Sequence, residues 1–75
     1  MTGTRQTYVD RLATGDFLFE LSIRRMTGEW DAPVATQPIV AVELCDDVDP
    51  YYRLTLADGT VADDVRGDMR VDVLA

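Results

Sequence analysis

Clusters of aspartate are the side chains of this sequence whose type and spacing come closest to a chemical site. One group consists of Asp46, Asp47 and Asp49, and the other of Asp63, Asp64 and Asp68. Hard cations such as Ca²⁺ and Mg²⁺ bind several carboxylate oxygens at once. Pro50 stands where a calcium-binding loop needs a further ligand, and the required glycine and terminal glutamate do not follow. We therefore interpret both groups as solvated turns and expect no metal and no cofactor.

Catalysis has few candidate groups in this chain. The sequence contains no histidine, which excludes imidazole bases, histidine-dependent nucleophiles and histidine metal sites. Paired carboxylates perform acid–base work only when burial separates their pKa values, and nothing in the sequence indicates that burial. Cys45 ends an apolar run, so we expect it to be a buried, unreactive residue. The sequence predicts that the protein is not an enzyme.

Exposed aromatic and arginine side chains are the remaining candidates for function, because both types anchor protein contacts. Trp30 lies in a segment that contains two prolines. Tyr51 is expected on the opposite face of its strand from Tyr52, so both Trp30 and Tyr51 are candidates for exposure. The arginines could converge to bind an acidic group, although the surplus of aspartates favours surface ion pairs. The candidate protein-contact residues are Trp30, Tyr51, Arg53, Arg24 and Arg25, together with the edge of a strand over 39–44.

Size and charge exclude several classes of protein. The chain has 75 residues, 14 acidic and 7 basic side chains, and a net charge of −7. This length suits one small domain, and the negative charge disfavours binding to a phosphate backbone. No apolar stretch is long enough to span a membrane, and the first eleven residues lack the apolar segment of a signal peptide. The expected location is the cytoplasm.

Alternating apolar residues predict most of the regular structure to be β-strand. The segment 17–23 alternates and is interpreted as a strand, with a helix over 8–26 as the alternative. The continuous apolar run 39–45 predicts a central strand. Another alternating strand covers 51–56, and Asp58-Gly59 after it indicates a hairpin turn. A 3₁₀ turn over 61–65 and a last strand over 69–74 complete the pattern.

These segments predict an all-β fold, a small five-stranded antiparallel barrel with the 3₁₀ turn before its last strand. Residues 1–7 are expected to form a flexible tail, and residues 8–75 the single barrel domain. The expected core residues are Phe17, Phe19, Tyr52 and Leu54.

Turn motifs and alternation together resemble those of a known class of small barrels. The segments that carry the resemblance are Val9-Asp10-Arg11-Leu12, Gly15-Asp16, Val40 to Leu44, Tyr52 to Gly59, and Val71-Asp72-Val73. This pattern resembles the SH3-like small β-barrels, including short proteins of actinobacteria and their phages. The absence of lysine and the excess of aspartate over glutamate are typical of such GC-rich genomes. The resemblance implies a fold and says little about function, and an OB-like topology stays open beside it.

The leading functional hypothesis is a non-enzymatic module that binds a protein partner or assembles with copies of itself. The alternative is an acidic decoy whose aspartates imitate nucleic-acid phosphates and occupy a basic DNA-binding protein. Small-molecule cofactors, nucleic acid and membranes are not expected as partners.

Overall fold

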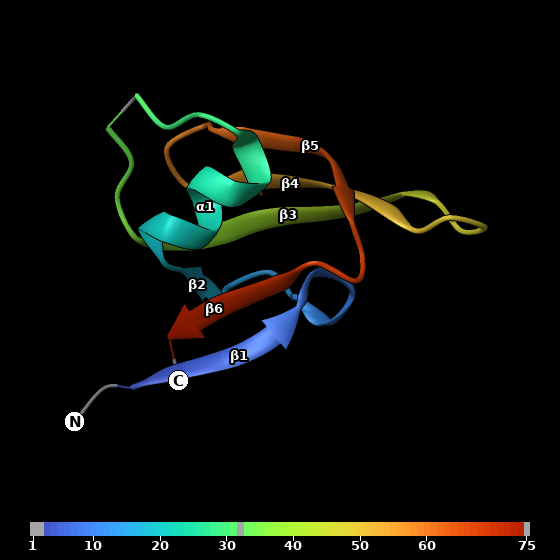
Figure 1. Ribbon diagram of the computed structural model, residues 1–75, viewed down its shortest axis with the longest axis horizontal. Coiled ribbons are helices and arrows are strands. Elements are labelled where there is room, and N and C mark those ends of the chain that lie inside the picture. Colours follow the sequence, from blue (N-terminus) through green and yellow to red (C-terminus); the bar gives the residue numbers. More distant parts are fainter. Residues whose placement is uncertain (1–2, 32, 75) are drawn as a thin grey trace.

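The computed structural model describes residues 3–31 and 33–74, which form one antiparallel sheet of six strands, a 3₁₀ helix and an α-helix (Figure 1). In chain order the elements are β1 (Thr4–Tyr8), η1 (Val9–Arg11), β2 (Phe17–Leu18), α1 (Glu20–Thr27), β3 (Gln37–Asp46), β4 (Tyr51–Leu56), β5 (Val61–Arg66) and β6 (Arg70–Leu74). The strand order in the sheet is β1-β6-β2-β3-β4-β5. Within the described residues, no helix is long and apolar enough to cross a membrane.

The predicted five-stranded barrel is wrong, although the predicted all-β class is confirmed, since strands predominate. The sheet has six strands and stays open, because its outermost strands β1 and β5 do not pair with each other. Strand β2 has only two residues and joins two larger parts of the sheet. Leu18 of β2 pairs with Gln37 of β3 on one side and with Val73 of β6 on the other. A junction this short lets the two parts of the sheet diverge.

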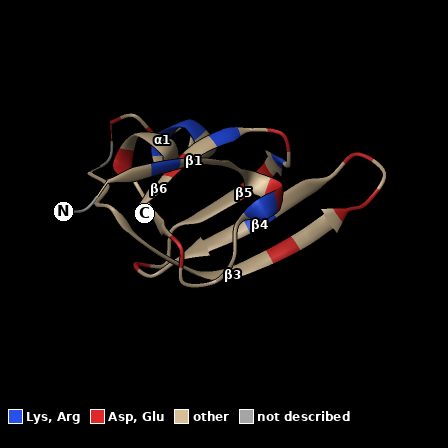
Figure 2. Cartoon of the chain, turned by 90° about the horizontal axis from the view of Figure 1, so that it is seen from below, with Lys and Arg blue, Asp and Glu red and all other residues tan. Residues whose placement is uncertain are grey.

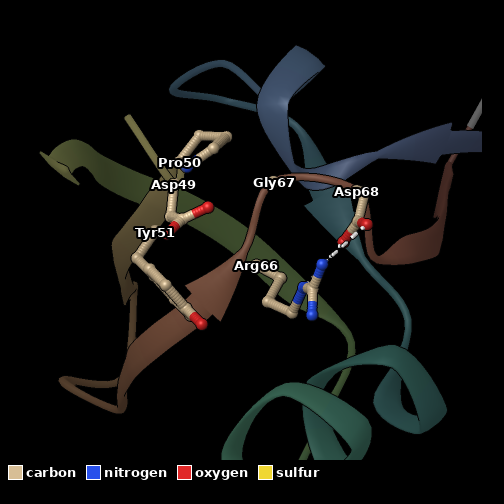
Figure 3. A pocket seen from close by; sticks show the side chains of 6 residues that line it. All are labelled: Asp49, Pro50, Tyr51, Arg66, Gly67 and Asp68. Atoms are coloured by element: carbon tan, nitrogen blue, oxygen red, sulfur yellow. Dashed lines mark hydrogen bonds and ion pairs between the residues drawn. The ribbon is translucent and has the colours of Figure 1, made fainter. Parts of the chain in front are cut away.

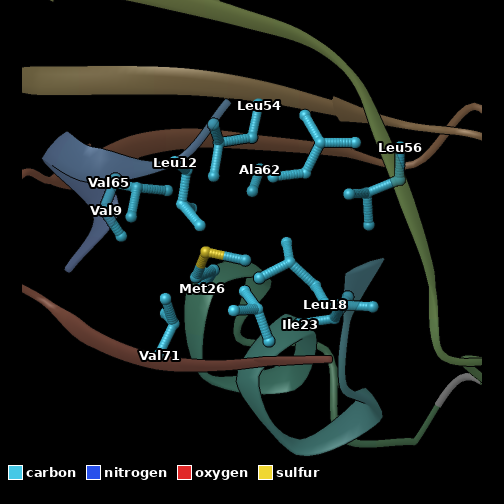
Figure 4. Close-up of a cluster of buried hydrophobic side chains, with 12 residues drawn as sticks. Val9, Leu12, Leu18, Ile23, Met26, Leu54, Leu56, Ala62, Val65 and Val71 are labelled. Carbon is cyan, nitrogen blue, oxygen red and sulfur yellow. The ribbon is translucent and has the colours of Figure 1, made fainter. Parts of the chain in front are cut away.

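Helix α1 fills the space between the two parts of the sheet. Figure 4 shows Ile23 and Met26 between Val71 of β6 on one side and Leu54 and Ala62 of β4 and β5 on the other. The twelve buried apolar residues that form this core are Val9, Leu12, Leu18, Ile23, Met26, Ile39, Leu54, Leu56, Ala62, Val65, Val71 and Val73. The helix therefore supplies the apolar surface that barrel closure would otherwise supply.

The strand expected over 17–23 exists only at Phe17–Leu18, and the chain is helical from Glu20 onward. Ile23 and Met26 are three residues apart and both buried, which is the spacing of a helix face. The helix ends at Gly28, whose φ of 74° lies in the left-handed region and whose N–H donates to the carbonyl of Arg24 at 2.8 Å. This glycine stop and the i, i+4 pair of Glu20 with Arg24 favour the helix over the alternation that suggested a strand.

Two of the four expected core residues lie elsewhere. Leu54 is fully buried as predicted, and Tyr52 is half-buried and packs against the core. Phe17 is exposed, because Leu18 is the residue of β2 that faces inward and successive strand residues point to opposite faces. Phe19 is half-buried at the start of α1, outside the core cluster.

The expected flexible tail over 1–7 is replaced by a strand as far as the structure describes it. Residues 4–8 form β1, and each of them pairs with a residue of β6, from Thr4 with Leu74 to Tyr8 with Arg70. Thr7 is buried against the core. Polar composition misled the prediction because β1 is an edge strand with one face on solvent. Residues 1 and 2 lie outside the described residues.

Strands are confirmed over 39–45 and 51–56 as β3 and β4, and their hairpin projects beyond the core (Figure 1). The prediction that 39–45 is a central strand is wrong, because β2 pairs with β3 only at Gln37 and Pro38 and the rest of β3 has a strand neighbour on one side alone. Two β-bulges interrupt the pairing, one between Ile39 and Ala41 and one between Leu44 and Asp46. The end of β3 extends past α1, so Leu44 is 51% exposed. Cys45 is exposed too, and the prediction of a buried thiol is wrong.

The hairpin predicted at Asp58-Gly59 is confirmed between β4 and β5. Gly59 has a φ of 91°, which favours glycine. Residues 61–66 form the strand β5 in place of the expected 3₁₀ turn, and Asp64 at φ 54° accommodates a bulge opposite β4. The 3₁₀ turn lies instead over Val9–Arg11.

Gly67 cannot carry a side chain without displacing its neighbours. A Cβ atom there would lie 2.9 Å from Cε1 of Tyr52, 3.2 Å from Cβ of Asp10 and 3.3 Å from the carbonyl oxygen of Pro50. We predict that Gly67→Ala lowers the free energy of unfolding by about 1–3 kcal/mol. Urea unfolding followed by circular dichroism measures this, with Gly3→Ala as the control because its added Cβ meets nothing within 4 Å. Equal losses in the two variants would contradict the packing.

Gln37 and Asp58 connect the start of β3 to the β4–β5 turn. Backbone N–H of Thr60 donates to Oδ1 of Asp58 at 2.8 Å, and Nε2 of Gln37 donates to Oδ2 at 3.0 Å. Hydrogen bonds from Thr60 and then from Gln37 lower the pKa of Asp58 from its ordinary value of 3.8.

A lowered pKa in the folded state means that ionised Asp58 stabilises the fold above its unfolded pKa. We predict that wild type is more stable than Asp58→Asn at neutral pH, and that the difference shrinks as pH falls through the lowered pKa of Asp58. Urea unfolding of both proteins across the acidic range measures it. A difference in stability that does not change with pH would contradict the assignment.

Candidate protein-binding groove

A groove lies between the first turn of α1 and the segment that follows the helix. It encloses about 530 Å³ and is lined by Phe19, Glu20, Leu21, Arg24, Trp30 and Thr36. Helix geometry places Leu21 here, since successive residues are rotated by about 100° and Ile23 and Met26 occupy the face toward the core. Leu21 is 49% exposed and Trp30 is 56% exposed.

Arg24 holds the segment after α1 against the helix. Its Nη1 donates to the carbonyl oxygen of Trp30 at 2.6 Å, and Nε and Nη2 each lie 3.2 Å from Oε1 of Glu20. The Arg24 side chain is only 16% exposed. Its guanidinium therefore positions Trp30 and is not free to bind a ligand anion.

A second hollow of about 310 Å³ contains Tyr51 (Figure 3). Pro50 and Gly67 form part of its wall, where the N–H of Gly67 donates to the carbonyl oxygen of Pro50 at 2.8 Å. Arg66 and Asp68 make a two-point ion pair at its mouth, with both N to O distances 3.2 Å. Tyr51 is half-buried and the charged pair is exposed. This hollow offers less exposed apolar surface than the groove.

Arg53 lies on the outer face of β4, between an acid on each neighbouring strand. Its Nη1 is 3.7 Å from Oε2 of Glu43, and its Nε is 3.3 Å from Oδ1 of Asp63. The hydrogen bond that Arg53 donates to Asp63 and the charges of Asp63 and Glu43 raise the pKa of Arg53 further. The guanidinium stays charged and is already paired, so a site for an acidic ligand is not formed here.

The predicted contact residues thus fall in separate places. Trp30 and Arg24 meet in the groove, Tyr51 and Arg53 lie on β4, and Arg25 is exposed on α1. Sequence reasoning missed Phe19 and Leu21, because both were read as members of a strand. A helical reading of 20–27 would have placed Leu21 away from Ile23 and Met26, and so on the surface.

The two aspartate groups lie in exposed segments. Asp46, Asp47 and Asp49 are in or beside the β3–β4 turn, where Oδ1 of Asp46 accepts the N–H of Val48 at 3.0 Å. Among the residues that the structure describes, no three His, Cys, Asp or Glu side chains are placed to hold a metal ion. Comparisons of the chain with protein-family models, curated proteins and solved structures gave no match. The resemblance to SH3-like barrels therefore stays a prediction.

Removal of the Arg24 hydrogen bonds should loosen Trp30. We predict that Arg24→Gln increases acrylamide quenching of the single tryptophan and lowers the free energy of unfolding by about 0.5–2 kcal/mol. Arg25→Gln is the matched control, since Arg25 is exposed and makes no ion pair within residues 3–31 and 33–74. Identical quenching in both variants would show that Arg24 does not position Trp30.

Proposed function

We propose that the protein is a non-enzymatic binding module that holds an apolar side chain of a partner protein in the groove between α1 and Trp30. The observation that carries this proposal is the exposure of Trp30, at 56%, beside Leu21 at 49%. A large aromatic side chain left on the surface next to another apolar residue is typical of a contact site.

The way in which the backbone of Trp30 is held supports a binding role for the groove. The alternative is that the groove results only from loose packing of the segment after α1 against the helix. Arg24 fixes the backbone carbonyl of Trp30 from a nearly buried position. A backbone that is already held at Trp30 loses less conformational freedom when a partner covers this segment. A tryptophan buries about 150–250 Å² in all, and Trp30 is 56% exposed. A partner that covers it therefore removes at most about 85–140 Å² from water, which corresponds to about 2–3.5 kcal/mol at 25 cal/mol per Å² before the costs of association.

A second candidate is the acidic decoy. All fourteen carboxylate side chains of the sequence lie within the described residues, and all but Asp16 and Asp72 belong to exposed residues. Exposed negative charge favours a basic protein surface and speeds association at low salt. In this case binding would depend on salt and not on the groove.

The groove can be tested by comparison of single-site variants in partner capture. We predict that immobilised wild type retains a partner from lysate of the source organism at moderate salt, and that Trp30→Ala loses it with a reduction in affinity of about 30-fold or more. The matched control is Val48→Ala, which removes an apolar side chain that is 86% exposed in the β3–β4 turn.

Emission of Trp30 then reports the contact directly, because the chain has one tryptophan. Titration of wild type with the purified partner should shift this emission to shorter wavelength as the indole leaves water. Equal capture by wild type and Trp30→Ala would refute the groove. If that capture were lost on addition of salt, the acidic decoy would be supported in its place.

A further inference from the structure

Besides the outer edge of β5, which pairs with β4 alone, two strand edges of the sheet are free of strand partners. One is the edge of β3 over 40–46, where β4 pairs on one side and β2 reaches only Gln37 and Pro38 on the other. The second is the outer edge of β1, which pairs with β6 alone. We propose that copies of the chain join head to tail through these edges, the β3 edge of one copy adding to the β1 edge of the next in a continuous sheet.

Backbone groups of β3 point to its free edge. Leu56 of β4 donates its N–H to Thr60 on the β5 side, and amides alternate in direction along a strand. Leu54 therefore also faces β5, and its partner Val42 on β3 faces away from β4. The same alternation directs the N–H and C=O of Leu44 to the free edge. The residues of β3 over 43–46 are exposed, so another strand can approach.

Backbone groups of β1 are directed outward in the same manner. Asp72 of β6 donates its N–H to Oγ of Ser22 and accepts from the N–H of Phe19, so its backbone groups point away from β1. Its partner across the ladder is Gln6, whose N–H and C=O therefore face away from β6. The N–H of Val9 donates to Met69, which fits the same alternation.

Charge makes the two edges complementary to each other. The β3–β4 hairpin carries the carboxylates of Glu43, Asp46, Asp47 and Asp49. Figure 2 shows acidic residues in red along β3 and at the tip of the hairpin. Arg5, Arg11 and Arg70 lie on β1, η1 and β6, and none of the three makes an ion pair in the part of the chain that the structure describes. They outnumber the carboxylates of the same three elements, which are Asp10 and Asp72. The acidic edge of one copy therefore attracts the basic edge of another.

Symmetric pairing is disfavoured by the same charges. Two β3 edges would bring two acidic hairpins together, and two β1 edges would bring the arginines together. A contact between unlike edges leaves one free edge at each end, so further copies can add and the assembly stays open. The net charge of −7 opposes it weakly at physiological salt, where the screening length of about 8 Å is far below the 38 Å length of the molecule.

Proline variants block one edge at a time, because proline has no backbone N–H to donate to a strand of another copy. Leu44→Pro deletes a donor on the β3 edge, and Gln6→Pro deletes one on the β1 edge, while neither removes a bond within the sheet. In sedimentation velocity from about 10 µM to about 1 mM at physiological salt, we predict that wild type forms species larger than dimers. Each proline variant alone should stay monomeric. An equal mixture should form dimers and nothing larger, because each variant keeps the edge that the other lacks.

Three controls separate edge pairing from other effects. Leu44→Thr and Gln6→Thr keep the N–H groups and should assemble as wild type does. Trp30→Ala leaves both edges intact and should also assemble, so loss of assembly in this variant would assign the contact to the groove and overturn the proposal. Circular dichroism confirms that each variant is folded.

If a proline variant unfolds, variants that reverse one charge near an edge test the same contact. Arg5→Glu and Asp47→Arg should each assemble less than wild type at low salt. Wild type that stays monomeric at about 1 mM would overturn the proposal. So would a folded proline variant that forms large species alone, or assembly that does not respond to either charge reversal.

Discussion

The structure depends on the position of Leu18, at the junction where the two parts of the sheet meet over a shared core. Leu18 is fully buried and pairs with β3 on one side and β6 on the other. Because β2 has two residues, hydrogen bonds alone hold this junction weakly. Apolar contacts of Leu18 with the core must supply most of the stabilisation, and a chain of 75 residues has no second core to replace them.

The narrow junction explains the other features of the molecule. The two parts of the sheet diverge, and α1 fills the space between them with Ile23 and Met26. Because one face of α1 packs into the core, Leu21 on another face of the helix lines the groove beside Trp30. Since β2 is short, most of β3 has no neighbour on one edge. The surfaces that we propose for binding thus follow from how the core is built.

Sequence patterns predicted the parts of the fold that are determined by residues close to one another in the sequence. The strands β3 and β4 and the Asp58-Gly59 turn are each specified by a few neighbouring residues and lie where they were expected, although β3 is not the central strand that its apolar run predicted. Helix α1 could not be separated from a strand, because Phe17, Phe19, Leu21 and Ile23 alternate while burial selects Leu18, Ile23 and Met26. Polar β1 gave no apolar signal, and only its pairing with β6 makes it a strand. In the site, Trp30 was predicted, but Leu21 depends on the helix and was missed.

Amide hydrogen exchange, resolved by NMR on a dilute sample, tests the open sheet most directly. The account predicts rapid exchange for Val42, Leu44 and Gln6, whose N–H groups face free edges, and slow exchange for Glu43 and Thr7, whose N–H groups face β4 and β6. This alternation of fast and slow amides would appear within each strand. Slow exchange at Val42, Leu44 and Gln6 in the monomer would contradict the account, because it would mean that these edges are paired as in a closed barrel.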